Sequence, residues 1–539
     1  HMSNRSLSYE HIIICVVGYL FNLGPMDSAI EIILSAGYVG LFLWLISKWS
    51  FFKRLDVPVT WIQGAFLLKV FSGVFIYLIY TRYYTDRSTA DIFKYFDDSL
   101  VIYKAAFDNP SDFFRMMCGI GNDNAHFNNT YYNVMNNWNR PYGSSLGNDT
   151  HTIIRFNAIT RFISLSYYNV HSVILNYLSL IGLAGIFLFL KRLLPNTPRV
   201  LFVLVFLFPG VLFWGSGVLK EGLLFFGLGM MLYCITRFLP FSEDEKTDYC
   251  WMFWVGLILS FVFLTTVKSY ALIAIVPAIL ALHVNHWRKA ANAKIVLGMY
   301  VSALVMALGV GFVNPELNSL HRLADKQKDF IALAKGGTYV KAQSRSSDTL
   351  YILPDHHVNL EFNSNRTSAL TKENVLAVHW TDAKHLETEP QILMQGEVVE
   401  VLLDLGNAGS RIDIPVLEPN PISFLINSPM AFVNGMLRPF PWEARSPFML
   451  LALIENLILM ILFGLLLWKF NLTKVNWHIW WIAILFSLVI ILLTGWVTPV
   501  IGAIVRYKVP ALPFIAAALV ALINHDFVKK IEKKLSFLG

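Results

Sequence analysis

Residues 477–494 read WHIWWIAILFSLVIILLT, a run that contains no Asp, Glu, Lys or Arg. A helix needs about 20 apolar residues to cross a hydrocarbon core of about 30 Å, so this run predicts a membrane-spanning helix. Further runs of this kind lie at 29–48, 61–81, 171–190, 199–215, 218–239, 251–267, 269–285, 294–313, 447–468 and 507–524. A shorter run at 10–24 is either another span or an interfacial helix. The sequence therefore predicts a polytopic α-helical membrane protein with about 11–12 spans.

The composition supports a membrane protein. The chain has 539 residues, of which 55% are hydrophobic and 15% charged, with a mean hydropathy of +0.53. A soluble domain carries about 25% charged residues. The net charge of +7 is explained by Lys and Arg beside the spans, and we infer no nucleic-acid partner from it. The 4 cysteines imply no disulfide framework.

Basic residues predict the orientation of the spans. If the spans alternate in direction, the basic loops fall on one side, which the positive-inside rule makes cytoplasmic. These residues are Lys48, Lys53, Arg54, Lys191, Arg192, Arg199, Arg288, Lys289, Lys294, Lys469, Lys474, Lys529, Lys530, Lys533 and Lys534. We expect the bacterial inner membrane, with the functional site facing the periplasm or exterior.

Two long segments lie on the opposite side. Residues 82–170 form a first extracytoplasmic loop, rich in Asp, Asn and Tyr, within an N-terminal transmembrane region, 1–313. Residues 314–446 form an extracytoplasmic lobe, and 447–539 form a C-terminal transmembrane region. Alternating apolar residues from Val398 to Leu403 and from Arg411 to Leu417 predict strands, so we expect a small mixed α/β lobe.

Acidic residues gather just after a predicted span, in TDRSTADIFKYFDDS (85–99). In a helix, Asp91, Tyr95 and Asp98 share one face. A carboxylate here could act as a general base, taking a proton from an acceptor hydroxyl while a phosphate-linked sugar is transferred. The candidates are Asp91, Asp86, Asp97 and Asp98. A solvated juxtamembrane helix would account for the same acids.

Basic residues at other outer span ends suggest a phosphate site. Lys220 and Glu221 lie in WGSGVLKEGLL (214–224), and Arg506 lies in IVRYKVPALPF (504–514). Charges at membrane depth are costly and are frequently functional. Arginine binds phosphate through two parallel hydrogen bonds. A local ion pair and an interfacial arginine are the alternatives.

A proline-rich segment, LRPFPWEARSPF (437–448), carries two further candidates. Arg438 could contact a phosphate, and Trp442 could stack on a sugar, although a rigid entry into the membrane would account for both. Lys268 is a weaker candidate.

Arg140, Asp149, His151 and Arg155 in the first loop are also weaker candidates, for which solvated side chains are the simpler interpretation. The adjacent His356 and His357 lack the spacing of a metal site. No P-loop, dinucleotide fingerprint, nucleophile elbow or zinc-protease helix is present, which argues against an ATP-driven pump and common hydrolases.

This layout resembles the GT-C superfamily of polytopic membrane glycosyltransferases. The resemblance rests on the acids of the first loop, the basic residues at outer span ends and the extra lobe. It implies a polyprenyl-linked sugar donor, a glycan, lipid or protein acceptor, and inverting transfer outside the cytoplasm. It also implies one first-loop acid as base, for which we favour Asp91, with Lys220, Arg438 and Arg506 facing the lipid phosphate. The acids here are spread over a stretch rather than gathered at the helix start. No cofactor is implied with certainty, although a divalent metal is possible.

Three alternatives remain open at this point. A Wzy-type polysaccharide polymerase or ligase would use outer arginines without an early carboxylate. A transporter or flippase of lipid-linked glycans would carry ionisable residues in the middle of spans or show two related halves. A non-catalytic assembly protein would bind a partner through the lobe.

Overall fold

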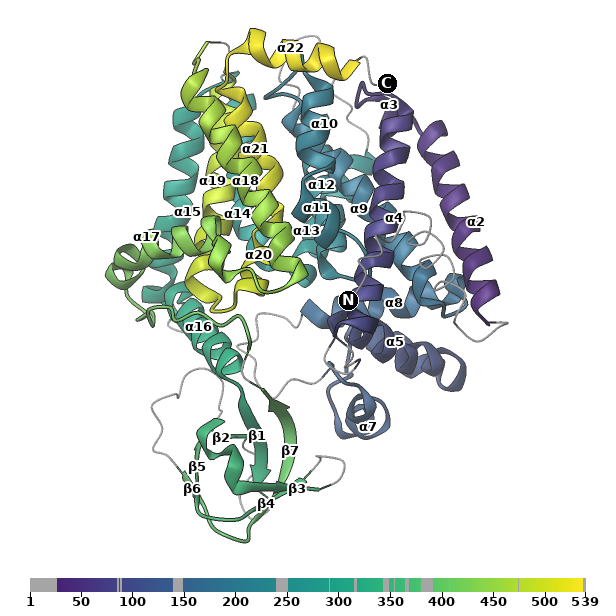
Figure 1. The fold of residues 1–539 in the computed structure, drawn as a ribbon, viewed down its shortest axis with the longest axis vertical. Helices are drawn as coiled ribbons and strands as arrows, with labels where there is room; N and C mark the ends of the chain where they lie inside the picture. The colour runs from purple at the N-terminus through teal and green to yellow at the C-terminus, as the bar shows by residue number, and fades with distance from the viewer. Residues whose placement is uncertain are drawn as a thin grey trace, which may run out of the picture.

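A computed structural model of the chain shows a bundle of long helices, with a small sheet at one end and the C-terminal helix lying across the other (Figure 1). The structure describes residues 27–84, 87, 90–138, 149–238, 251–289, 291–314, 318–342, 349–352, 354–363, 368–379, 391–406, 408–473 and 475–536.

Within these residues, nine helical segments are long and apolar enough to cross a membrane. The chain is therefore a polytopic helical membrane protein. The segments are α2 (Asp27–Lys48), α4 (Val59–Arg82), α9 (Tyr168–Leu190), α12 (Lys220–Phe238), α14 (Ser269–Trp287), α15 (Ala293–Val313), α18 (Pro447–Trp468), α19 (Trp477–Val497) and the run of α20 (Ile501–Tyr507), η5 (Val509–Ala511) and α21 (Leu512–Ala521).

The expected span at 199–215 is not one helix. It divides into α10 (Pro198–Phe206) and α11 (Pro209–Trp214), with Phe208 in an extended conformation between them. The break follows from Pro209, which lacks an N–H and disfavours the helical conformation in the residue before it.

Other expected spans also differ. Helix α13 (Trp251–Val267) is apolar but has only 17 residues. The last span begins at Ile501 rather than at 507, which places Arg506 inside the last turn of α20. The run at 10–24 lies outside the described residues, so the total of 11–12 spans stays a prediction.

Helices α9 and α12 approach each other closely because glycines line their contact. A Cβ atom on Gly229 would overlap the carbonyl oxygen of Gly182, and one on Gly185 would overlap that of Gly229. Small residues allow backbones to approach closely, which is a common way for helices to associate in membranes.

We expect Gly229→Ala to lower the free energy of unfolding by about 1–3 kcal/mol, because the added methyl forces the two backbones apart. Denaturant or thermal unfolding in detergent measures this. Gly40→Ala in α2 is the matched control, since nothing lies within 4 Å of the position its Cβ would take. Equal stability of the two variants would contradict this account of the α9–α12 contact.

The first loop folds into short helices at the end of the bundle that carries the sheet (Figure 1). They are α5 (Asp91–Asp108), α6 (Pro110–Cys118), α7 (Ala125–Thr130), η1 (Tyr132–Val134) and α8 (Asp149–Ser164). Helix α5 packs along α8. The buried Arg161 of α8 joins them, because its Nε donates to Ser99 Oγ at 2.8 Å. The loop is therefore a folded layer at the end of the bundle that carries the sheet.

Within the expected lobe (314–446), the strands between Gly337 and Leu405 form one small antiparallel sheet. Helix α16 (Ser319–Lys335) leads into strands whose order is β3-β4-β7-β1-β2-β5-β6. The strands are β1 (Gly337–Ala342), β2 (Leu350–Ile352), β3 (Leu360–Phe362), β4 (Ser368–Thr371), β5 (Val375–His379), β6 (Gln391–Leu393) and β7 (Val398–Leu405), with η3 (Pro354–Asn359) after β2. Strand β7 confirms the expected strand at Val398–Leu403.

The expected strand at Arg411–Leu417 is wrong. This segment leaves the sheet and runs against the bundle, where the Ile412 amide donates to the Pro499 carbonyl at 2.8 Å. The Leu417 amide donates to Gln327 Oε1 at 2.7 Å. Its alternating pattern reflects contact with helices on one side, and α17 (Pro421–Leu437) then packs along α19.

Basic loops from distant parts of the sequence meet at the end of the bundle away from the sheet. Lys191 pairs with Asp56, and short helix α3 (Ser50–Lys53) lies nearby. Arg199 pairs with Glu532 of α22 (His525–Ser536) at 3.2 Å. Helix α22 lies across this end (Figure 1). These basic residues therefore lie at one end of the bundle, while the orientation of the spans stays a prediction.

Candidate functional site

Three cations and three carboxylates meet where several helices reach the sheet end of the bundle. Each comes from the end of a helix or from a helix junction, and their formal charges cancel. They are Asp91 of α5, Asp149 of α8, Lys220 and Glu221 of α12, Lys268 before α14, and Arg506 of α20. We call these six residues the charge cluster.

Arg506 joins two carboxylates within the charge cluster. Its Nε donates to Glu221 Oε1 at 2.6 Å, and its Nη1 donates to Asp91 Oδ2 at 2.9 Å. The two acids differ in access, because the Glu221 side chain is 1% exposed and that of Asp91 is 39% exposed. Glu221 Oε2 is buried without a partner in the described part of the chain. Arg506 is thus anchored by one acid and reaches solvent beside the other.

Asp149 joins the two lysines in the same way. Its Oδ1 lies 2.8 Å from Lys220 Nζ, and its Oδ2 lies 2.9 Å from Lys268 Nζ. Lys220 also donates to Thr150 Oγ1 at 2.9 Å. Both lysine side chains are at most 10% exposed, so the carboxylate of Asp149 offsets charge that burial would otherwise penalise.

Aromatic rings flank the cations. Lys220 Nζ lies 5.0 Å from the centre of the Tyr95 ring, and Lys268 Nζ lies 4.9 Å from that of Tyr507. Arg506 lies 6.0 Å from the ring of Trp214. Such contacts stabilise desolvated cations.

A glycine turn places Lys220 and Glu221. Gly217 has φ 73°, a conformation that suits glycine, and its amide donates to Asn176 Oδ1 at 2.9 Å. Helix α12 starts at Lys220, so both residues lie in its first turn. Asp91 likewise starts α5, where the helix dipole favours a carboxylate.

Neighbouring charges shift the pKa values of Asp91 and Lys268, which lie outside the spans. Burial raises the pKa of Asp91, but Arg506 and Lys220 outweigh burial and lower that pKa to about 2. Burial lowers the pKa of Lys268, but Asp149 outweighs burial and raises it. Asp91 is therefore ionised and Lys268 protonated near neutral pH.

The Asp91 pKa predicts an acid-sensitive contribution to stability. The pKa falls from 3.8 to about 2 on folding, so the ionised carboxylate stabilises the fold above about pH 4 and this contribution is lost as the pH falls towards 2. Solvent screening of a side chain that is 39% exposed limits the effect to about 1 kcal/mol. Denaturant unfolding at pH 6 and pH 2.5 should show a smaller loss for Asp91→Asn than for the wild type. Identical losses would contradict the prediction.

The structure brings most of the expected site residues together. Asp91, Tyr95, Lys220, Glu221, Lys268 and Arg506 all belong to the charge cluster or touch it. Tyr95 and Asp98 are both buried, as expected from their shared face of α5. Asp86 lies outside the described residues.

Other expected residues have separate partners. Asp97 pairs with Arg87 at 2.6 Å on the surface. Asp98 accepts hydrogen bonds from the amides of Asn136 and Asn137 at 2.7 and 2.8 Å, and burial raises its pKa to about 6 against these bonds. Both acids thus have structural partners within or beside the first loop.

Arg438 does not join the charge cluster. Its Nη1 donates to Glu443 Oε1 at 2.6 Å, within the segment that contains η4 (Pro441–Glu443). Trp442 is 75% exposed and stacks on Phe440 with ring centres 5.1 Å apart. The phosphate-binding role expected of Arg438 has no support in this geometry.

On sequence grounds we gave too little weight to Asp149 and did not single out Trp214 or Tyr507 as site residues. Asp149 follows residues 139–148, which the structure does not describe, and only the fold shows that it starts a helix beside α12. Two other weak candidates have partners within the first loop. The His151 ring stacks on that of Trp138, with ring centres 3.8 Å apart, and Arg155 Nε donates to the Met116 carbonyl at 2.8 Å. Arg140 is outside the described residues.

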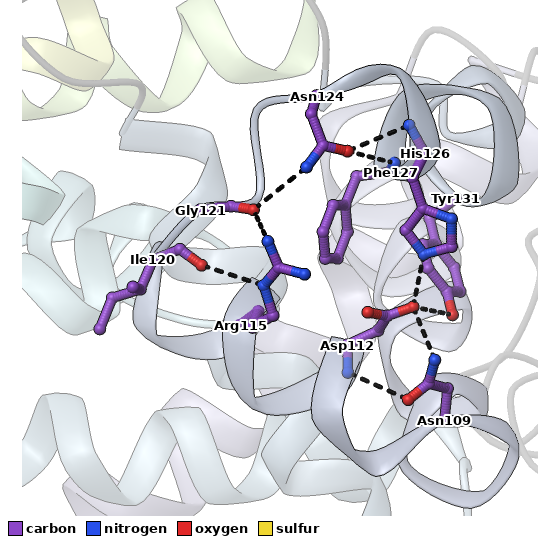
Figure 2. A network of polar contacts seen from close by, with 9 residues as sticks. All are labelled: Asn109, Asp112, Arg115, Ile120, Gly121, Asn124, His126, Phe127 and Tyr131. Atoms are coloured by element: carbon purple, nitrogen blue, oxygen red, sulfur yellow. Dashed lines mark hydrogen bonds and ion pairs between the residues drawn. The ribbon is translucent and has the colours of Figure 1, made fainter.

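A second polar network lies within the first loop (Figure 2). Asp112 Oδ2 accepts from Asn109 Nδ2 at 2.9 Å and from the Tyr131 hydroxyl at 3.1 Å, and His126 Nε2 lies 2.7 Å away. Arg115 extends to the Gly121 carbonyl. The bonds join α6 to α7, so the network stabilises the loop. No group of three His, Cys, Asp or Glu side chains suited to a metal occurs in the described part of the chain.

A third group of charges is buried between α18 and η5. Lys508 Nζ lies 3.7 Å from Glu455 Oε1 and donates to Asn456 Oδ1 at 2.8 Å. Glu455 Oε2 accepts from the Gly210 amide at 2.8 Å, and a Cβ at residue 210 would overlap it. This pair joins the broken helix α11 to the residues just after Arg506.

Searches of protein-family models, curated proteins and solved structures found no match to this chain.

Proposed function

We propose that this protein is a membrane glycosyltransferase, similar to the GT-C superfamily, that moves a sugar or glycan from a polyprenyl-phosphate or diphosphate carrier to an acceptor. The observation that carries the proposal is Arg506, which lies between a half-exposed carboxylate, Asp91, and a buried one, Glu221. A phosphate-binding cation beside an accessible base is the pairing that this reaction needs.

In the proposed reaction, the acceptor hydroxyl oxygen attacks the anomeric carbon of the sugar. The bond from that carbon to the phosphate oxygen breaks, and its electron pair leaves with the phosphate. Asp91 takes the hydroxyl proton. Arg506, Lys220 and Lys268 stabilise the charge on the leaving phosphate, while Glu221 and Asp149 hold these cations in place.

The distribution of charge supports a site outside the cytoplasm. The basic loops and α22 lie at the end of the bundle opposite the sheet (Figure 1), and positive loops favour the cytoplasm. In this orientation the charge cluster and the lobe face the periplasm or exterior, and α13 and the α10–α11 pair contribute two further crossings to the nine long segments.

Transfer assays with purified protein in lipid nanodiscs test the proposal. Polyprenyl-phosphate sugars serve as donors, with soluble glycans as acceptors, and Asp91→Asn should abolish measurable transfer. Asp97→Asn is the matched control in the same helix, because Asp97 pairs with Arg87 instead. Unchanged turnover in Asp91→Asn would contradict its role as base. Transfer that survives loss of all first-loop acids would favour the Wzy-type alternative.

A transporter of lipid-linked glycans is the second candidate. The observation in its favour is a set of ionisable residues within spans: Lys69 of α4 is buried and donates to the Gly215 carbonyl at 2.7 Å, and Glu455 of α18 is also buried. Movement of a labelled lipid-linked glycan across vesicles, without transfer to any acceptor, would favour this function.

A further inference from the structure

The guanidinium of Arg506 uses only some of its hydrogen-bond donors. Glu221 uses its Nε and Asp91 uses its Nη1, whereas its Nη2 has no hydrogen-bond partner in the described part of the chain. Arginine can offer two parallel N–H groups to one phosphate. An anion that binds through Nη1 and Nη2 would therefore compete with Asp91 but leave the bond to Glu221 intact.

An incoming anion would displace Asp91 from Arg506 more easily than it would displace Glu221. Glu221 is 1% exposed, so losing Arg506 would leave its charge buried and unpaired. Asp91 is 39% exposed, so water can solvate its carboxylate once Arg506 is taken by another anion. The easily replaced partner is thus Asp91.

We propose that Arg506 is an interlock between donor and base: the phosphate of the lipid carrier takes Nη1 and Nη2, and this binding releases Asp91 to act on the acceptor. The inference rests on the proposed function and adds a regulatory step to the same site. Glu221 is the positioning residue that keeps the guanidinium in place during the exchange.

The release changes the chemistry of Asp91. While Arg506 is bound, the pKa of Asp91 is about 2, so the carboxylate is a weak base for a hydroxyl group. Loss of the neighbouring cation and arrival of a phosphate both raise the pKa of Asp91, which makes the carboxylate a better base. The base becomes effective only when the donor is bound.

Binding of inorganic phosphate to the full-length protein in detergent, measured by calorimetry, tests the interlock. Asp91→Asn should bind phosphate about tenfold more tightly than the wild type, because the competing carboxylate is gone. Asp97→Asn should bind as the wild type does, and adding Arg506→Lys to Asp91→Asn should remove the gain. Asp91→Ser serves as a second variant, with thermal unfolding to verify that each protein is folded.

Equal phosphate affinity of the wild type and both folded Asp91 variants would overturn the interlock, even if sugar transfer depends on Asp91. If the Asp91 variants bind phosphate more tightly but the wild type transfers no sugar, the anion exchange stands and the proposed function fails. A short-chain prenyl monophosphate is the second probe. Tighter wild-type binding of this probe than of inorganic phosphate supports a lipid carrier, and equal binding of both would overturn the lipid source.

Discussion

Replacing Lys508 by Met should lower the free energy of unfolding by about 3–5 kcal/mol, because it leaves the buried carboxylate of Glu455 without its cation. Lys508 is 1% exposed and Glu455 0% exposed, so water does not solvate the remaining charge. Lys508 also donates to the Arg438 carbonyl at 3.2 Å, and that bond is lost as well. Unfolding in detergent, followed by circular dichroism, measures the change.

A paired substitution separates the charge from the packing. Glu455→Gln combined with Lys508→Met should recover most of the lost stability, because no unpaired charge remains. Arg87→Met is the surface control and should cost less than about 1 kcal/mol, since Arg87 and Asp97 are 54% and 35% exposed. A loss in Lys508→Met no greater than in Arg87→Met would show that the buried pair is not a source of stability.

The sequence predicted the class of fold because apolar runs of about 20 residues, repeated along a chain, are characteristic of membrane spans and rare in soluble domains. The predicted span at 199–215 was wrong because Pro209 breaks the helix. The predicted strand at Arg411–Leu417 was wrong because its alternating pattern reflects contact with the bundle. Periodicity reports which side of a segment is buried, but it does not report whether a strand or a helix covers that side.

The sequence predicted that acidic and basic residues lie at span ends, but it did not predict which of them form ion pairs in the charge cluster. Asp91 and Arg506 are separated by 415 positions, and only the tertiary fold brings the start of α5 beside the end of α20. Arg438 and Arg506 were equivalent phosphate-binding candidates in the sequence. In the structure, Arg438 instead pairs with Glu443, five positions along the chain. The partner of a charge depends on the tertiary fold, which local spacing does not encode.

Arg506→Lys should lower transfer by about 100-fold or more, even though it keeps the positive charge. The compact ammonium of lysine lacks the planar fork with which arginine can bond Glu221 through Nε and offer its other two nitrogens to a phosphate. The cation would therefore be poorly placed when charge develops on the leaving phosphate. Steady-state kinetics with a polyprenyl-phosphate sugar donor measure the effect.

The kinetic constants should show where the interaction acts. If Arg506 stabilises charge that grows in the transition state, kcat should fall more than KM rises. Arg438→Lys is the matched control and should keep transfer within about twofold, because its partner is Glu443 and it touches no residue of the charge cluster. Equal losses in the two variants would exclude a special role for Arg506, whereas a fall confined to Arg506→Lys would place the leaving phosphate beside Glu221 and Asp91.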